Sequence, residues 1–274
     1  ITRAQAAQVI ADHFGTRVRH TGGTYDTRLV PDQQGRDWKI VSDASIEGPQ
    51  EQRTELVSPI CTWEDIETVQ ALVRKLRQAG AKAHSSTGIH VHIGRGRHTP
   101  KTLRNLVNLV NSKENLLALA LGISQARLDR WCQPIDQDFL ARLNRRKPST
   151  DAAFAQLWYN TPYWEAHARQ HYDSSRYHLL NLHSVFQKGT IEFRAFNGTL
   201  HAGEIKAYIQ LAMAISHQAL TVSSASPRKS ETDNPKYTFR CWLLRLGFIG
   251  EEFATAREHL TKRLPGNAAW RQAS

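Results

Sequence analysis

Two short segments of the sequence place ionisable side chains in the alternating pattern that is typical of strands. In GIHVHIG, His90 and His92 alternate with β-branched apolar residues, and in GTIEFRAF, Glu192 and Arg194 alternate with apolar residues. Side chains at i and i+2 of a strand share one face, so each strand has an apolar face and a face that carries ionisable groups. Imidazole, carboxylate and guanidinium groups are side chains that bind divalent cations and phosphate.

Two further segments repeat this arrangement. Glu55 lies opposite the apolar Leu56 in QRTELVSP, while Lys39 and Asp43 share a face in DWKIVSDASI. Four such strands in one sheet would form a concave polar surface. Buried charges are costly unless they are paired or bound to a metal, so this surface favours a site for metal ions and phosphate.

Each of these patterns also has a simpler explanation. A His-x-His pair is common on a solvated strand face, and a Glu and an Arg at i and i+2 commonly form an exposed ion pair of small energy. The occurrence of ionisable residues on one face of several strands, each with an apolar opposite face, favours a binding site over these simpler explanations. The phosphate-binding patterns GxxxxGK[ST] and GxGxxG are both absent from the sequence.

The elements that must position these residues follow from periodicity and caps. Thr62 and Asp65 begin a helix at 62–80 with a capping-box pattern, and a second helix begins at Pro100. A third helix is expected at about 202–221. The segment LLNLHSVF reads as a strand, TGGTYDTRLVPDQQGRD as turns, and SSASPRKSETDNPK as a polar loop.

The order of these elements is not a regular βαβ repeat. It predicts an α+β fold with a mostly antiparallel, curved sheet and helices packed on one face. We expect one catalytic domain over 1–274, with an irregular insertion at 129–175 and a helical C-terminal tail at 223–274.

Composition narrows the class of protein. The net charge is +11 and the pI is about 9.8, but the basic excess is spread along the chain, and anionic small molecules explain it as well as nucleic acid does. No run of apolar residues is long enough to span a membrane, and the first residues lack the apolar core of a secretory signal. Three widely spaced cysteines form no disulfide or zinc pattern and are expected to be mostly buried thiols, so a cytoplasmic protein is expected.

Several blocks of the sequence, taken together, resemble one enzyme family. ELVSP, STGIHVHIG, RYHLLNLHS, GTIEFRAFNGTLH and KYTFRCWLLRLGFIGEEF are similar to signature blocks of the amidoligases, which are distantly similar to glutamine synthetase and glutamate–cysteine ligase. The resemblance implies a glutamine synthetase-like catalytic fold. Family members usually begin with a Gly-x-Glu-x-Glu strand whose glutamates bind metal, and we expect Ile1 to follow the place of that strand.

The resemblance also implies roles for individual residues. Glu55, His90 and Glu192 match metal ligands. His92 and Arg194 match positions beside the nucleotide phosphates, where Arg194 would hold the transferred phosphoryl group.

Four more residues receive weaker expectations. Arg176 is a second candidate for a catalytic phosphate-binding cation. Asn181 and Asn197 are candidate polar liners of the nucleotide site, and Asp43 is a candidate base for the incoming ammonium group.

The implied activity is ATP-dependent formation of an amide or peptide bond through an acyl phosphate, with ATP and Mg²⁺, or Mn²⁺, as cofactors. The substrates would be a small-molecule or peptide carboxylate and an amine, and neither nucleic acid nor a membrane is expected as a partner. Two alternatives stay open at this point. One is a degenerate module that binds nucleotide or nucleic acid without turnover, and the other is a metal-dependent hydrolase that needs no ATP.

Overall fold

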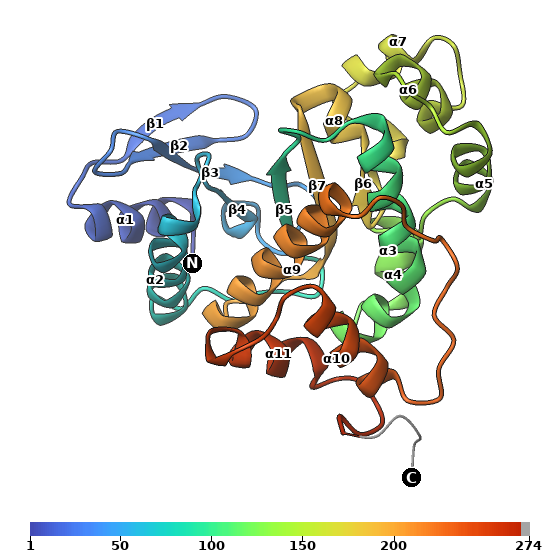
Figure 1. Cartoon of the computed structure of the whole chain (residues 1–274). Helices are drawn as coiled ribbons and strands as arrows, with labels where there is room; N and C mark the ends of the chain where they lie inside the picture. Colours follow the sequence, from blue (N-terminus) through green and yellow to red (C-terminus); the bar gives the residue numbers. More distant parts are fainter. Residues whose placement is uncertain (270–274) are drawn as a thin grey trace. The chain divides into compact units, whose positions relative to one another are not determined.

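The computed structural model describes residues 1–269, which form two compact units (Figure 1). The first unit comprises residues 1–88 and 198–206, and the second comprises 89–197 and the residues from 207 onward. We describe each unit by itself. No helix in the described part of the chain is long and apolar enough to cross a membrane.

The first unit is built on a four-stranded antiparallel sheet in the order β1-β2-β3-β4. Its strands are β1 (Arg19–Gly22), β2 (Thr27–Pro31), β3 (Asp37–Ser42) and β4 (Thr54–Val57), and its helices are α1 (Arg3–Phe14) and α2 (Ile66–Gln78). Ile10 of α1 packs with Trp38 and Ile40 of β3 and Leu72 of α2, all of them buried. β2 lies in the stretch that was expected to hold only turns.

The start of α2 follows the predicted capping box. The backbone N–H of Thr62 donates to the carboxylate of Asp65 at 2.8 Å. Arg36 then holds Asp65 through both of its terminal nitrogens, at 2.7 and 2.9 Å, and donates from Nε to Asp32 at 2.8 Å. These contacts join the β2–β3 turn to the helix start.

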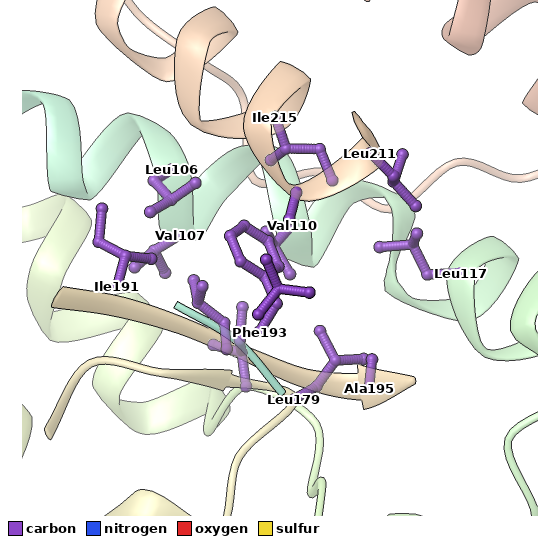
Figure 2. Packing of buried hydrophobic residues seen from close by; sticks show 14 of the residues in the cluster. Leu106, Val107, Val110, Leu117, Leu179, Ile191, Phe193, Ala195, Leu211 and Ile215 are labelled. Carbon is purple, nitrogen blue, oxygen red and sulfur yellow. The ribbon is translucent and has the colours of Figure 1, made fainter. Parts of the chain in front are cut away.

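The second unit contains a three-stranded sheet in the order β5-β7-β6. Its strands are β5 (Gly88–Gly94), β7 (Thr190–Asn197) and the short β6 (Leu180–Asn181), which pairs antiparallel with β7. Figure 2 shows Ile191 and Phe193 of β7 packed beneath α3 (Pro100–Leu121) and α9 (Ala202–Thr221). The predicted α+β class is therefore confirmed, while the glutamine synthetase-like fold stays a prediction.

Two predictions about strands were wrong. The four strands with ionisable faces do not share one sheet, because β3 and β4 belong to the first sheet and β5 and β7 to the second. The segment LLNLHSVF is a strand only at Leu180–Asn181, and its second half belongs to α8, which spans His183–Lys188. Leu182, Val185 and Phe186 are spaced as one helix face and pack in the core, which explains the helix.

The segment 129–175 also differs from the irregular insertion that was expected. It carries α5 (Gln137–Arg146), α6 (Asp151–Tyr159) and α7 (Trp164–Arg169) after α4 (Gln125–Arg130). The side chain of Asp136 caps α5 and that of Thr150 caps α6, at 2.6 and 3.2 Å from the backbone nitrogens that they accept from. These two N-cap residues were the signal in the sequence, masked by the polar composition of the segment.

The predicted C-terminal tail begins with an extended stretch. α10 (Pro235–Arg245) and α11 (Ala254–Thr261) follow this stretch, and residues 270–274 of the tail lie outside the described residues. Four asparagines on α3 bind the stretch by donating their side-chain amides to its backbone carbonyls: Asn105 to Val222 (3.0 Å), Asn108 to Ala225 (2.9 Å), Asn111 to Pro227 (2.6 Å) and Asn115 to Ser230 (3.1 Å). This ladder supplies partners for backbone groups that no sheet or helix satisfies.

We predict that Asn108→Ala lowers the free energy of unfolding by about 1–2 kcal/mol, because it removes a buried side chain that bonds both the half-buried carbonyl of Ala225 and the side-chain amide of Asn144. Asn115→Ala is the matched control, since Asn115 is exposed and should cost at most about 0.5 kcal/mol. Urea unfolding followed by circular dichroism measures both changes. Equal losses in the two variants would contradict a ladder anchored at its buried rungs.

Candidate active site

The candidate site is centred on the carboxylate of Glu192, which lies on β7 and is 2% exposed. Its Oε1 accepts a hydrogen bond from Nη1 of Arg194 at 2.7 Å, and its Oε2 accepts one from Nδ2 of Asn181 at 2.5 Å. Arg194 is itself 6% exposed, so this is a buried ion pair and not the exposed pair that the sequence also allowed. Removing one partner of such a pair is far more costly than removing a surface pair.

The two histidines of β5 face the same carboxylate. His90 Nδ1 lies 3.4 Å and His92 Nε2 lies 3.6 Å from Oε1 of Glu192. The strand alternation predicted that these imidazoles share a face, and this is confirmed. Their side chains remain 31% and 35% exposed, so both imidazoles are accessible from solvent although Glu192 is not.

Burial and charge set the protonation states of these groups. Burial raises the pKa of the Glu192 carboxyl, but Arg194 and the two histidines outweigh it and bring that pKa down to about 2. Burial, together with the charge of Arg194, lowers the pKa of His90 to about 3. Burial is also the main cause that lowers the pKa of His92. The site at neutral pH therefore contains an ionised carboxylate, a guanidinium and two neutral imidazoles.

Aromatic rings frame the cationic side of the site. The guanidinium carbons of Arg194 and Arg176 each lie 5.7 Å from the ring centroid of Tyr177. Trp131 packs edge-on against Tyr177 at 5.5 Å, and its backbone carbonyl accepts a bond from Nε of Arg194 at 3.4 Å. Arg176 also donates to the carbonyl of His171 at 2.8 Å. The structure thus brings the two predicted phosphate-binding arginines to one aromatic ring.

The two predicted asparagines have clear local partners. Asn181 orients Glu192 as described above, and its Oδ1 lies 3.4 Å from the backbone nitrogen of Ser184. Asn197 donates to the carbonyls of Leu121 and Gly122 at 3.1 and 2.9 Å, where α3 ends. A contact of either amide with a nucleotide stays a prediction.

Glu55 and Asp43 belong to the first unit and not to the unit that carries Glu192. Glu55 is half-buried on β4, where it pairs with Val41 of β3. Asp43 follows the end of β3, and its Oδ1 accepts from the backbone N–H and the hydroxyl of Ser45 at 2.8 and 2.7 Å. This is a turn-stabilising contact. The roles of Glu55 as a metal ligand and of Asp43 as a base stay predictions.

The metal question can be examined through the donor atoms. Among residues 1–269, no group of three or more His, Cys, Asp or Glu side chains is arranged to hold a metal ion. Two of the three predicted ligands, His90 and Glu192, are nevertheless adjacent, and they are neutral and ionised respectively, as metal binding requires. A role of these two donors in holding a metal ion stays a prediction.

Sequence reasoning missed several residues of the site. Thr190 Oγ1 lies 3.0 Å from Nδ1 of His92 and 2.7 Å from the hydroxyl of Ser184, and Trp131 and Tyr177 support the arginines. Thr190 could have been found, because it precedes Glu192 by two residues on the same strand face. Trp131 and Ser184 had no such signal, since they come from helical segments that the sequence did not reveal.

The cysteine thiols take no part in this arrangement. Cys132 is buried and donates to the carbonyl of Arg127 at 3.3 Å, and burial raises the pKa of its thiol. A raised pKa disfavours the nucleophilic thiolate. The prediction of buried thiols is therefore confirmed for Cys132, whereas Cys61 and Cys241 are only half-buried.

The architecture and the site define an α+β protein with a buried, charged centre whose pKa values are shifted, which is typical of functional sites. Residues 1–216 match the family described as "Putative amidoligase enzyme". The chain belongs to this family, which makes a ligase its class of activity. Comparisons with curated proteins and with solved structures find no match.

We predict that the Glu192 carboxylate makes the free energy of unfolding fall as the solution is acidified. The folded pKa of about 2 is below the ordinary value of 4.5, so its contribution is fully present above pH 4.5 and is lost as the pH falls toward 2. Glu192→Gln should flatten the decline of unfolding free energy in this window. At neutral pH the variant should lose about 3–5 kcal/mol, because Arg194 is left buried without a counter-charge.

Urea unfolding at a series of pH values measures this effect. Glu252→Gln is the control, because Glu252 is an exposed glutamate of the same unit and its replacement should leave the stability unchanged. Identical acid profiles for wild type and Glu192→Gln would show that the pair does not stabilise the fold.

Proposed function

We propose that this chain is an ATP-dependent ligase that joins a carboxylate to an amine through an acyl phosphate. The observation that carries this proposal is the buried Glu192–Arg194 pair with two neutral imidazoles, in a chain of the amidoligase family. A carboxylate does not condense with an amine in neutral water, because its oxygen is a poor leaving group. Transfer of the γ-phosphoryl group of ATP to the carboxylate creates the leaving group.

Arg194 is the residue that we assign to the phosphoryl group. Its contacts with Glu192 and Trp131 use two of the five N–H groups of a guanidinium, and Tyr177 supports its plane. The ion pair with Glu192 and the Tyr177 ring hold the planar guanidinium of Arg194 in one orientation. A fixed planar fork binds two oxygens of a phosphoryl group at once, which favours the charge distribution of the transferring group.

The remaining residues would bind and shield the reactants. Arg176, on the same ring as Arg194, is proposed to contact a second phosphate. Glu192 and His90 would hold Mg²⁺, or Mn²⁺ given the imidazole, as two of its ligands, and the ion would neutralise phosphate charge when bound. His92 is proposed to contact a phosphate or carboxylate oxygen. The burial of Glu192 supports exclusion of water, which would otherwise hydrolyse the acyl phosphate.

We expect the purified protein to form hydroxamates from hydroxylamine and a panel of amino acids and dicarboxylates, only when ATP and Mg²⁺ are present. Hydroxylamine replaces the amine and traps an acyl phosphate. Arg194→Lys should keep its fold and lower the rate of phosphate release by roughly 10³-fold, because an ammonium cannot replace the planar fork. Arg95→Lys is the matched control, since Arg95 pairs with Asp151 and should keep wild-type turnover.

The same experiment separates the alternatives. A hydrolase would act without ATP, and a binding module would bind ATP without releasing phosphate. Slow background release of phosphate from ATP gives a readout that does not depend on the choice of carboxylate. If Arg194→Lys released phosphate at the wild-type rate, Arg194 would have only a structural role. Arg176 would then be the next candidate for the cation that binds the phosphoryl group.

We also predict a division of labour between the two histidines. His90→Ala should weaken Mn²⁺ binding by roughly tenfold or more, because it removes a neutral donor next to the Glu192 carboxylate. His92→Ala should change Mn²⁺ affinity by less than about twofold and should mainly weaken the use of ATP. Calorimetric titration with Mn²⁺ and with ATP compares the variants. Equal Mn²⁺ affinities in the two variants would overturn this division.

A further inference from the structure

The imidazole of His92 is held by two hydroxyl groups on the side away from Glu192. Nδ1 of His92 lies 3.0 Å from Thr190 Oγ1 and 3.5 Å from Ser184 Oγ, and the two hydroxyls lie 2.7 Å apart. Ser184 is 2% exposed, so its hydroxyl hydrogen must find its acceptor within the protein. The position of each hydrogen in this trio can therefore be assigned by counting donors and acceptors.

Both hydroxyl hydrogens can be used inside the trio only if Nδ1 accepts, and the assignment with the shorter contacts is the following. Ser184 donates to Thr190, Thr190 donates to Nδ1 of His92, and Nδ1 accepts as an unprotonated nitrogen. If Nδ1 carried a hydrogen, it would donate to Thr190, and one of the two hydroxyl hydrogens would have no acceptor among these three groups. In that case Nε2, without a hydrogen, would also turn a lone pair toward Glu192 Oε1 at 3.6 Å, and the repulsion between two acceptors favours the first assignment.

We propose that Ser184 and Thr190 are positioning residues that hold His92 in the tautomer with its hydrogen on Nε2. A hydrogen on Nε2 makes this atom a hydrogen-bond donor and removes it from the ligands available to a metal. Nε2 lies 3.6 Å from Glu192 Oε1, which is longer than a good hydrogen bond. The Nε2–H group is therefore near the carboxylate but can still donate a hydrogen bond to a ligand.

The donor has room for a ligand oxygen. The His92 side chain is 35% exposed, and Arg194 contacts the same carboxylate oxygen. The N–H of His92 and the fork of Arg194 thus present donors around one point of the site. The chemical class that fits them is an anionic oxygen of a phosphoryl or carboxylate group, and this use of the donor rests on the proposed function, whereas the tautomer does not.

The two histidines differ in this respect although they share a strand face. Within residues 1–269, the contact of His90 Nδ1 is with Glu192, and no hydroxyl pair supports that ring. The Ser184–Thr190 pair therefore gives a structural reason for different roles of the two imidazoles.

Long-range ¹H–¹⁵N NMR of ¹⁵N-histidine-labelled protein, without ATP or metal, tests the tautomer. His92→Gln identifies the His92 resonances by their loss. In the wild type we expect an unprotonated, hydrogen-bonded Nδ1 and a protonated Nε2. Thr190→Val should give a mixture of tautomers and Thr190→Ser should restore the single form, because Ser keeps the hydroxyl. A protonated Nδ1 in the wild type, or an unchanged spectrum in Thr190→Val, would overturn the proposal.

Calorimetric titration with metal-free ATP tests the use of the donor. Thr190→Val should weaken ATP binding about five- to tenfold, the effect of one misdirected hydrogen bond, and Thr190→Ser should recover most of it. Thr221→Val is the matched control, because that hydroxyl bonds only to carbonyls of its own helix and its loss should leave the affinity unchanged. Wild-type affinity in Thr190→Val would refute the donor role toward phosphate. Since neither measurement involves turnover, failure here is distinct from failure to form hydroxamates.

Discussion

The buried ion pair between Glu192 and Arg194 is the interaction on which the candidate site depends. A carboxylate with 2% exposure is stable only if its neighbours supply donors, and Arg194 and Asn181 do so on its two oxygens. Asn181 is available because β6 pairs with β7 in the register that sets it opposite Glu192. The pairing of β6 with β7 therefore brings the side-chain amide of Asn181 to the Glu192 carboxylate.

The opposite face of β7 explains why the pair is held rigidly. Ile191 and Phe193 are buried against α3 and α9, so the alternate residues are fixed toward the site (Figure 2). A packed core tolerates little displacement, and this limits movement of Glu192 and Arg194 as well. One face of β7 therefore packs in the core, and its opposite face carries the site residues Glu192 and Arg194.

The charges of the site suit an anionic ligand. The Glu192 carboxylate pairs with Arg194, a second arginine, Arg176, lies against the same Tyr177 ring, and the imidazoles add donors without adding charge at neutral pH. Under the proposed function this centre would attract phosphate, whereas the spread net charge of +11 would give only weak and general attraction. The position of a single cation relative to the carboxylate matters more here than the total charge.

Local patterns in the sequence determined the strand faces and the caps, while the ligase class came from the resemblance of whole blocks to a family. The alternation in GIHVHIG and GTIEFRAF placed His90 with His92 and Glu192 with Arg194, and Thr62 marked the start of its helix, because these features depend on neighbours within a few residues. Tertiary structure decided the rest. It buried the Glu192–Arg194 pair, separated the polar strands into two sheets and brought Trp131 to Arg194, since burial and sheet membership depend on residues far apart in the chain.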